Sequence, residues 1–183
     1  FVVNRLDAEG AIYYFSTTES GIVRCDVEDT EPVPWFSQSS GNTEGSCVGC
    51  HEINPQGDRM AYAWSDDDIA RQGLASITED GEADLILTHT SGRDKAYFST
   101  YDPSGAYMVL SSESDLFVYD GQTGELLHEI TADIDLTMPD WSPDGSMLVA
   151  ISGRNMNSDV NFSNGYLVIL EHLGEGQFSE PWA

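Results

Sequence analysis

One short turn motif recurs four times along the chain and limits its possible folds more than any other feature. Each copy has the form D/N/S-P-x-G, or a degenerate version of it, and is followed by a run of apolar residues. Proline at the second position fixes φ, and glycine accepts a backbone conformation that other residues avoid. Each copy therefore predicts a tight turn between antiparallel strands, at residues 6–10, 53–57, 101–105 and 141–145.

The spacing of these turns predicts the architecture. The turn glycines Gly10, Gly57, Gly105 and Gly145 lie 47, 48 and 40 residues apart, and further strand-like runs follow each of them. Helical periodicity is nearly absent, and only residues 68–72 are expected to form a turn of helix. Four strands per unit at this period are typical of a β-propeller blade. We predict an all-β, single-domain β-propeller over residues 1–183, with four-stranded antiparallel blades at 1–38, 39–90, 91–132 and 133–183.

A family resemblance supports this architecture. Residues 139–145, Pro-Asp-Trp-Ser-Pro-Asp-Gly, resemble the repeat signature of TolB-like β-propellers, relatives of the WD-repeat class. The similarity extends more weakly through the other three units. Propellers of that family commonly have more than four blades. The resemblance therefore implies an arc of a larger propeller, with a closed four-bladed ring as the alternative.

Residues 47–51 read Cys-Val-Gly-Cys-His, which is the attachment signature of a c-type haem. Two thiols at this spacing can each form a thioether to the porphyrin, and the adjacent imidazole can bind the iron from one face. We therefore predict haem c attached to Cys47 and Cys50, with His51 as the proximal iron ligand.

The same residues admit other interpretations. Cys47 and Cys50 can form a disulfide, act as a redox pair, or supply half of a zinc site together with His51. A redox pair of the thioredoxin type is expected to begin a helix in a βαβ unit, which this all-β pattern does not offer. A zinc site needs a second ligand pair, whereas the remaining cysteine, Cys25, and the other histidines are scattered singly. Cys25 itself lies in a strand-like run, where a buried thiol is expected.

Alignment of the repeats on their turn glycines predicts where the haem lies. It makes Cys50, Phe98 and Met138 equivalent, each leading into the inner strand of its blade. In a propeller such connections converge toward the central axis on one face. Residues 41–51 are longer than the corresponding segments and polar, so we predict a haem-attachment loop with room for a porphyrin.

Met138 is the first candidate for the sixth iron ligand, because its equivalence to Cys50 places it near the same face and a thioether is an established haem ligand. Ordinary apolar packing is the alternative role for Met138. His89, at the end of a predicted outer strand, is the second candidate ligand. The other two histidines, His128 and His172, are expected to face solvent or to be bonded locally.

Several further side chains have a structural and a haem-related interpretation. Four aromatic residues are expected to fill the space between blades rather than to line a haem pocket: Tyr62, Trp64, Tyr101 and Trp141. Arg93 and Lys95 are candidates to pair with a haem propionate, with solvent exposure as the simpler alternative.

The net charge of the chain limits the classes of partner that it can bind. Thirty-two acidic residues against 7 basic ones give a formal net charge of −25. Such a surface repels nucleic acid and anionic membranes, and favours redox partner proteins such as other cytochromes or proteins with basic surfaces. No apolar run approaches the ~18 residues of a membrane span. Covalent haem attachment implies a periplasmic or extracellular location.

These observations predict electron transfer by a single-haem c-type cytochrome that is not an enzyme, since no GxSxG, HExxH, Walker or dinucleotide motif occurs. One alternative is a five-coordinate haem that binds small ligands or supports peroxidase-like chemistry. Another is a haem-free recognition module in which Cys47 and Cys50 form a disulfide.

Overall fold

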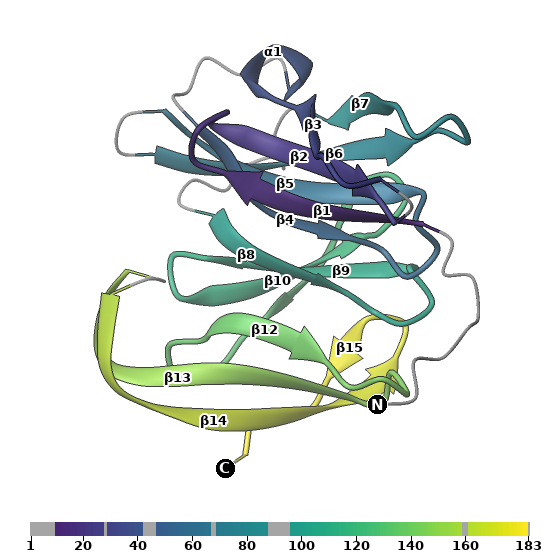
Figure 1. The fold of residues 1–183 in the computed structure, drawn as a ribbon. Coiled ribbons are helices and arrows are strands. Elements are labelled where there is room, and N and C mark those ends of the chain that lie inside the picture. Colours follow the sequence, from purple (N-terminus) through teal and green to yellow (C-terminus); the bar gives the residue numbers. More distant parts are fainter. Residues whose placement is uncertain are drawn as a thin grey trace, which may run out of the picture.

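The chain folds into four antiparallel β-sheets stacked one after another in sequence order (Figure 1). The computed structural model describes residues 10–27, 29–41, 47–66, 69–87, 96–158 and 161–182. The first sheet has three strands and the others have four. The inner strand predicted for the first blade falls on residues 1–9, which lie outside the described residues.

The described residues form fifteen strands and one short helix. In chain order, the elements are β1 (Ala11–Ser16), β2 (Gly21–Asp26), β3 (Val33–Phe36), α1 (Gln38–Gly41), β4 (Cys47–Ile53), β5 (Arg59–Asp66), β6 (Ile69–Ile77), β7 (Ala83–Leu87), β8 (Ala96–Tyr101), β9 (Tyr107–Ser112), β10 (Asp115–Asp120), β11 (Leu126–Ile130), β12 (Thr137–Trp141), β13 (Met147–Ser158), β14 (Asn161–Gly174) and β15 (Gln177–Phe178). The sheets are β1–β3, β4–β7, β8–β11 and β12–β15.

Three of the predicted turns, at 53–57, 101–105 and 141–145, lie within the described residues and form as expected, and the structure explains why they begin with Asn, Asp or Ser. The turn predicted at residues 6–10 lies almost entirely outside the described residues. The side chain at the first turn position accepts a backbone hydrogen bond from the start of the following strand. The Tyr107 N–H donates to Asp102 Oδ1 at 2.7 Å, and the Met147 N–H donates to Ser142 Oγ at 2.9 Å. Gly57, Gly105 and Gly145 have φ of 75°, 71° and 71°, the left-handed region that favours glycine.

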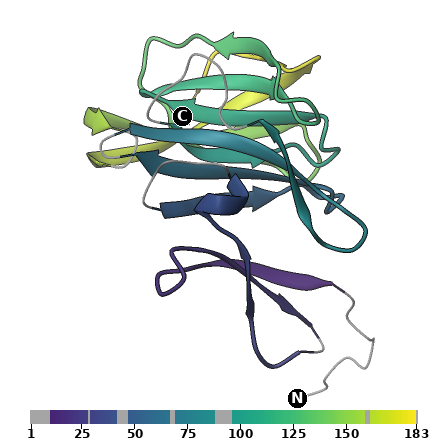
Figure 2. The same cartoon turned by 90° about the horizontal axis from the view of Figure 1, so that it is seen from above.

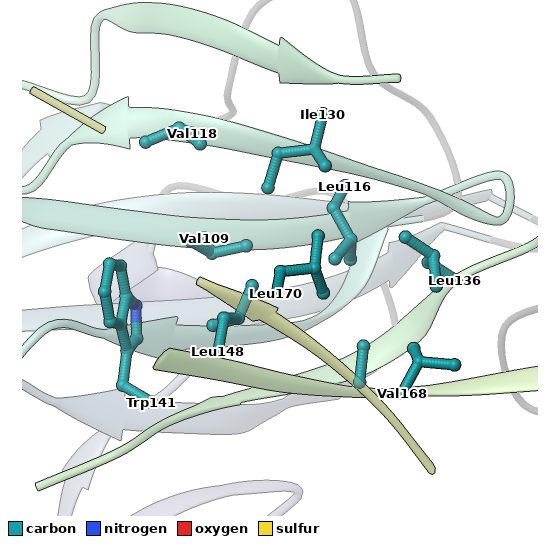
Figure 3. Packing of buried hydrophobic residues seen from close by; sticks show 10 residues of the cluster. Val109, Leu116, Val118, Ile130, Leu136, Trp141, Leu148, Val168 and Leu170 are labelled. Atoms are coloured by element: carbon teal, nitrogen blue, oxygen red, sulfur yellow. The ribbon is translucent and has the colours of Figure 1, made fainter. Parts of the chain in front are cut away.

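The hydrophobic core lies between consecutive sheets. Figure 3 shows the interface of the third and fourth sheets, where Val109 and Val118 face Leu148 and Leu170. Separate buried clusters join the second sheet to the third and the first to the second. In Figure 1 the first sheet lies near the top and the fourth at the bottom, and in Figure 2 the first sheet lies apart from the other three. Every extensive contact between sheets joins neighbours in sequence.

The described residues 69–72 are not helical. Strand β6 begins at Ile69 and pairs with β5 along its length, so the predicted helical turn is wrong. Arg71 is more exposed than the buried residues on either side of it, Ala70 and Gln72, and its guanidinium carbon lies 5.2 Å from the centre of the Trp64 ring. Cross-strand packing therefore determines the conformation of this segment.

Among the described residues, no helix has the length and apolarity that a membrane span requires.

Candidate haem-attachment site

The CxxCH motif lies in strand β4, the first strand of the second sheet. The pairing of β4 with β5 is regular up to Gly49 and resumes at Glu52, so Cys50 and His51 together oppose one residue, Tyr62. This is a β-bulge, and Cys50 has a φ of 42°. Cys50 is exposed and His51 is half-buried. The side chain of Cys47 and residues 42–46 of the predicted attachment loop lie outside the described residues.

The same distortion occurs in the fourth sheet, at the position that the repeat alignment assigns to Cys50. The pairing of β12 with β13 shifts between Thr137 and Asp140, and Met138 has a φ of 49°. In the third sheet the shift lies between Ala96 and Phe98, where the one extra residue, Tyr97, has no residue opposite it. Cys50 and Met138 therefore share a backbone geometry as well as a repeat position.

His51 is anchored by the first sheet. Its imidazole donates a hydrogen bond to the backbone carbonyl of Tyr13 in β1, and burial lowers the pKa of the ring despite that bond. The ring is therefore neutral near pH 7, with one nitrogen protonated and the other holding a lone pair. Metal-binding histidines are typically oriented in this way, by a hydrogen bond from the nitrogen that does not bind the metal.

Two further contacts bring the first sheet close to the motif. A Cβ atom on Gly49 would lie 3.2 Å from Cδ2 of Phe15, so glycine lets the Phe15 ring pack against the strand. The Val48 N–H lies 3.4 Å from the carbonyl oxygen of Ser20, in the turn between β1 and β2. The Leu136 N–H donates to Ser114 at 2.7 Å in the corresponding place between the third and fourth sheets. The motif is thus built between two blades.

The residue after His51 faces the opposite neighbour. A carboxylate oxygen of Glu52 accepts hydrogen bonds from the Tyr101 N–H at 3.0 Å and the Thr100 hydroxyl at 3.4 Å, both in β8. Burial raises the pKa of Glu52 to about 7, the two hydrogen bonds oppose this, and the negative charge of Asp140 adds to it. Glu52 was not predicted from the sequence to be part of the site. The sequence signal that points to it is that the residues at the equivalent repeat positions, Thr100 and Asp140, are also polar.

Glu52→Gln is expected to stabilise the protein at high pH only. The folded-state pKa of Glu52 lies above its usual value of 4.5, so ionisation costs stability as the pH rises from about 4.5 to about 7. Glutamine keeps the accepting oxygen and removes the charge. We expect the free energy of unfolding to rise by on the order of 2 kcal/mol at about pH 8 and to change little at about pH 4. Urea unfolding at both pH values measures this, with the exposed Glu125→Gln as control. A gain that is equal at both pH values would contradict the assignment.

The candidate iron ligands are distributed as follows. Met138 is half-buried in β12, and β8 lies between β12 and β4, because it contacts both. His89, Arg93 and Lys95 lie outside the described residues. Within the described part of the chain, no three His, Cys, Asp or Glu side chains come together. A haem does not require such a cluster, because the porphyrin itself supplies four ligands to the iron.

The remaining histidines and aromatic residues have the predicted structural roles. His128 Nε2 lies 3.0 Å from the Glu175 carbonyl oxygen, and His172 Nδ1 lies 3.1 Å from that of Gly145. Both are therefore bonded locally. The four aromatic candidates are buried between blades, with 7% or less of their surface exposed: Tyr62, Trp64, Tyr101 and Trp141. Cys25 is half-buried in β2 rather than fully buried.

Comparison with known proteins finds the fold but no close relative. No protein-family model matches the chain, and no curated protein matches it. Among solved structures, TolB from Acinetobacter baumannii is 16% identical with a TM-score of 0.59, over 93% of this chain and 40% of that one. A putative TolB from Agrobacterium tumefaciens is 16% identical with a TM-score of 0.63, over 92% and 59%. Hydrazine synthase from Kuenenia stuttgartiensis is 14% identical with a TM-score of 0.57, over 92% and 49%.

This chain thus spans between 40% and 59% of the length of these three proteins. At such identities the likeness concerns the fold alone. Together with the four stacked antiparallel sheets, it shows that the chain has the TolB-like β-propeller fold.

Proposed function

We propose that this chain is a c-type cytochrome that transfers electrons through one haem c, attached to Cys47 and Cys50 and bound at the iron by His51. The observation that carries the proposal is the CxxCH motif on β4, with a neutral His51 whose second ring nitrogen is left with a lone pair by the hydrogen bond to Tyr13. The exposure of Cys50 supports it as well, since a thioether requires an accessible thiol.

In this function the protein holds the haem and orients His51, the proposed ligand to its iron. Haem c supplies a one-electron couple between ferric and ferrous iron. The Tyr13 carbonyl fixes the tautomer and the orientation of His51, and partial burial of the ring keeps it unprotonated. The pairing of β4 with β5 on both sides of the bulge holds the motif within the second sheet. No residue is assigned a bond-making role on a substrate, so we propose a carrier and not an enzyme.

For the sixth iron ligand we propose Met138, with His89 as the second candidate. Support for Met138 comes from its equivalence to Cys50 in repeat position and in backbone conformation. A methionine thioether raises the reduction potential of a haem.

We propose that the protein's partners are redox proteins with basic surfaces, other cytochromes among them. The formal net charge of −25 supports this, because a negative surface attracts positively charged proteins. Attachment chemistry outside the cytoplasm supports a periplasmic or extracellular location.

The decisive experiment is production of the chain in cells that carry haem-maturation machinery. We expect haem staining of the denatured polypeptide, an intact mass raised by one haem, and a pyridine haemochrome spectrum of the c type. Absence of all three from a competent host would leave the haem-free recognition module with its Cys47–Cys50 disulfide.

Met138→Ala tests the sixth ligand. If Met138 binds the iron, the variant loses the methionine-to-iron charge-transfer band and its reduction potential falls. Met147→Ala, an exposed methionine of the same sheet, is the matched control and should change neither. A high-spin ferric spectrum in the unmodified protein would favour the five-coordinate alternative instead.

A further inference from the structure

Phe15 is a partly exposed aromatic residue that lies on the CxxCH motif. Alternate residues of a strand point to the same side, so Tyr13 and Phe15 share the face of β1 that is turned toward β4. Between Cys47 and Cys50, a Cβ atom on Gly49 would lie 3.2 Å from Cδ2 and 3.5 Å from Cε2 of the Phe15 ring. The ring is nevertheless 37% exposed.

The other sheets have small, buried residues at the position of Phe15. Backbone hydrogen bonds at the ends of the hairpins define the register between sheets, and they make Phe15 equivalent to Ala63 and Ser111. These bonds run from the N–H groups of Val27, Ile77 and Gly121 to the carbonyls of Gly10, Asp58 and Ala106, respectively. Both Ala63 and Ser111 are buried. The first sheet therefore differs from the second and third in holding a large apolar side chain partly in water at this position.

Core packing does not account for the Phe15 ring. Tyr13 packs against the buried cluster between the first and second sheets, whereas Phe15, two residues further along β1, lies outside that cluster. Glycine at position 49 makes room for the ring, because a side chain there would press against it. The contact thus combines a bare backbone in the middle of the motif with an apolar ring whose remaining surface is open.

We propose that Phe15 is a positioning residue of the haem site, whose ring packs against the porphyrin attached to Cys47 and Cys50. This inference rests on the proposed function. A porphyrin joined to both thiols spans the segment between them, and Phe15 covers part of that segment at Gly49. Burial of an exposed aromatic ring against a flat apolar macrocycle is favourable. Strand β1 then serves the site twice, through the Tyr13 carbonyl that orients His51 and through the Phe15 ring.

Contact with Phe15 has a consequence for the redox couple. An apolar side chain beside the porphyrin keeps water away from that part of it, and solvent exposure is one of the factors that set the reduction potential of a bound cofactor. Water stabilises the more highly charged ferric state. Removal of the ring should therefore lower the potential.

Phe15→Ala in the haem-bearing protein tests the inference. We expect a lower reduction potential, a shifted Soret band, and a loss of Tm that is larger than in the same variant produced without haem. The haem-free protein measures the structural cost of losing the ring, so the difference between the two losses is the coupling of Phe15 to the porphyrin. Phe15→Tyr keeps the ring and should restore the potential and the Soret band.

Tyr14→Ala is the matched control, because Tyr14 is the next residue of β1, points to the opposite face and is 42% exposed. It should change neither the potential nor the Soret band. An unchanged potential in Phe15→Ala, with an equal loss of Tm in the presence and absence of haem, would overturn the inference and leave the proposed function standing. Failure of the unmodified chain to acquire haem in a competent host would instead overturn the proposed function, and this inference with it.

Discussion

Cys47→Ser combined with Cys50→Ser is expected to abolish covalent haem attachment completely. The two thioethers are the only covalent bonds that the proposed site makes to the porphyrin, and a serine hydroxyl does not replace a thiol in this reaction. Cys50 is exposed on a bulged strand, so its replacement removes little packing and the propeller should still fold. Haem staining after denaturing electrophoresis and the intact mass measure the result.

Two sets of variants make this experiment specific. Cys25→Ser removes the third cysteine, which is half-buried in β2, and should leave haem attachment unchanged. Each single variant of the motif should retain at most one thioether and a smaller yield of haem-bearing protein. Stain that persists in the double variant at the level of the unmodified chain would show that the porphyrin is held elsewhere.

Gly73→Ala is expected to destabilise the protein more than a typical strand substitution. A Cβ atom at this position would overlap Cζ of Tyr62 and lie 2.5 Å from its hydroxyl oxygen. Tyr62 is the partner of Gly73 across β5 and β6. Tyr62 is fully buried and packs on Phe36 with ring centres 4.7 Å apart, so it has little room to move. Replacing glycine within a strand normally gains about 0.5–1 kcal/mol. The overlap should reverse this and lower the free energy of unfolding by about 3 kcal/mol, or Tm by roughly 10 °C.

A double-mutant cycle identifies the cause. Tyr62→Leu removes the two atoms that the new Cβ would meet, at its own cost in packing with Phe36. In that background Gly73→Ala should cost less than about 1 kcal/mol in urea unfolding, and the difference is the coupling between the two positions. An equal cost in both backgrounds would show that the Tyr62 ring is not the obstacle.

The architecture was predictable because its signal is local and repeated. Each D/N/S-P-x-G turn sets its own geometry, and the side chains of Asp102 and Ser142 fix the start of the next strand from within the turn. Four such turns at blade-like spacing determine the number of sheets and their order. The equivalence of Cys50 and Met138 followed from the same spacing and reappears in their shared left-handed conformation.

The environment of the motif was not predictable, because it depends on contacts between blades. The hydrogen bond from His51 to Tyr13 joins two different sheets, and so do the hydrogen bonds to Glu52 from β8. No pattern along the chain states which side chains face one another across such an interface. The helical turn expected near residue 70 was wrong for a related reason, since Arg71 gains its contact with Trp64 only when β5 and β6 pair within the second sheet.

The kink at Cys50 has a consequence for how such a site can arise. Met138 adopts the same kink without any cysteine beside it, so this backbone conformation does not depend on the proposed haem attachment. Exchange of side chains on such a strand is then enough to place thiols and an imidazole at these positions, without a change in the backbone of the strand. In the fourth unit, the positions equivalent to Cys47, Cys50 and His51 are Asp135, Met138 and Pro139. The backbone there already has the same kink, and only the side chains differ.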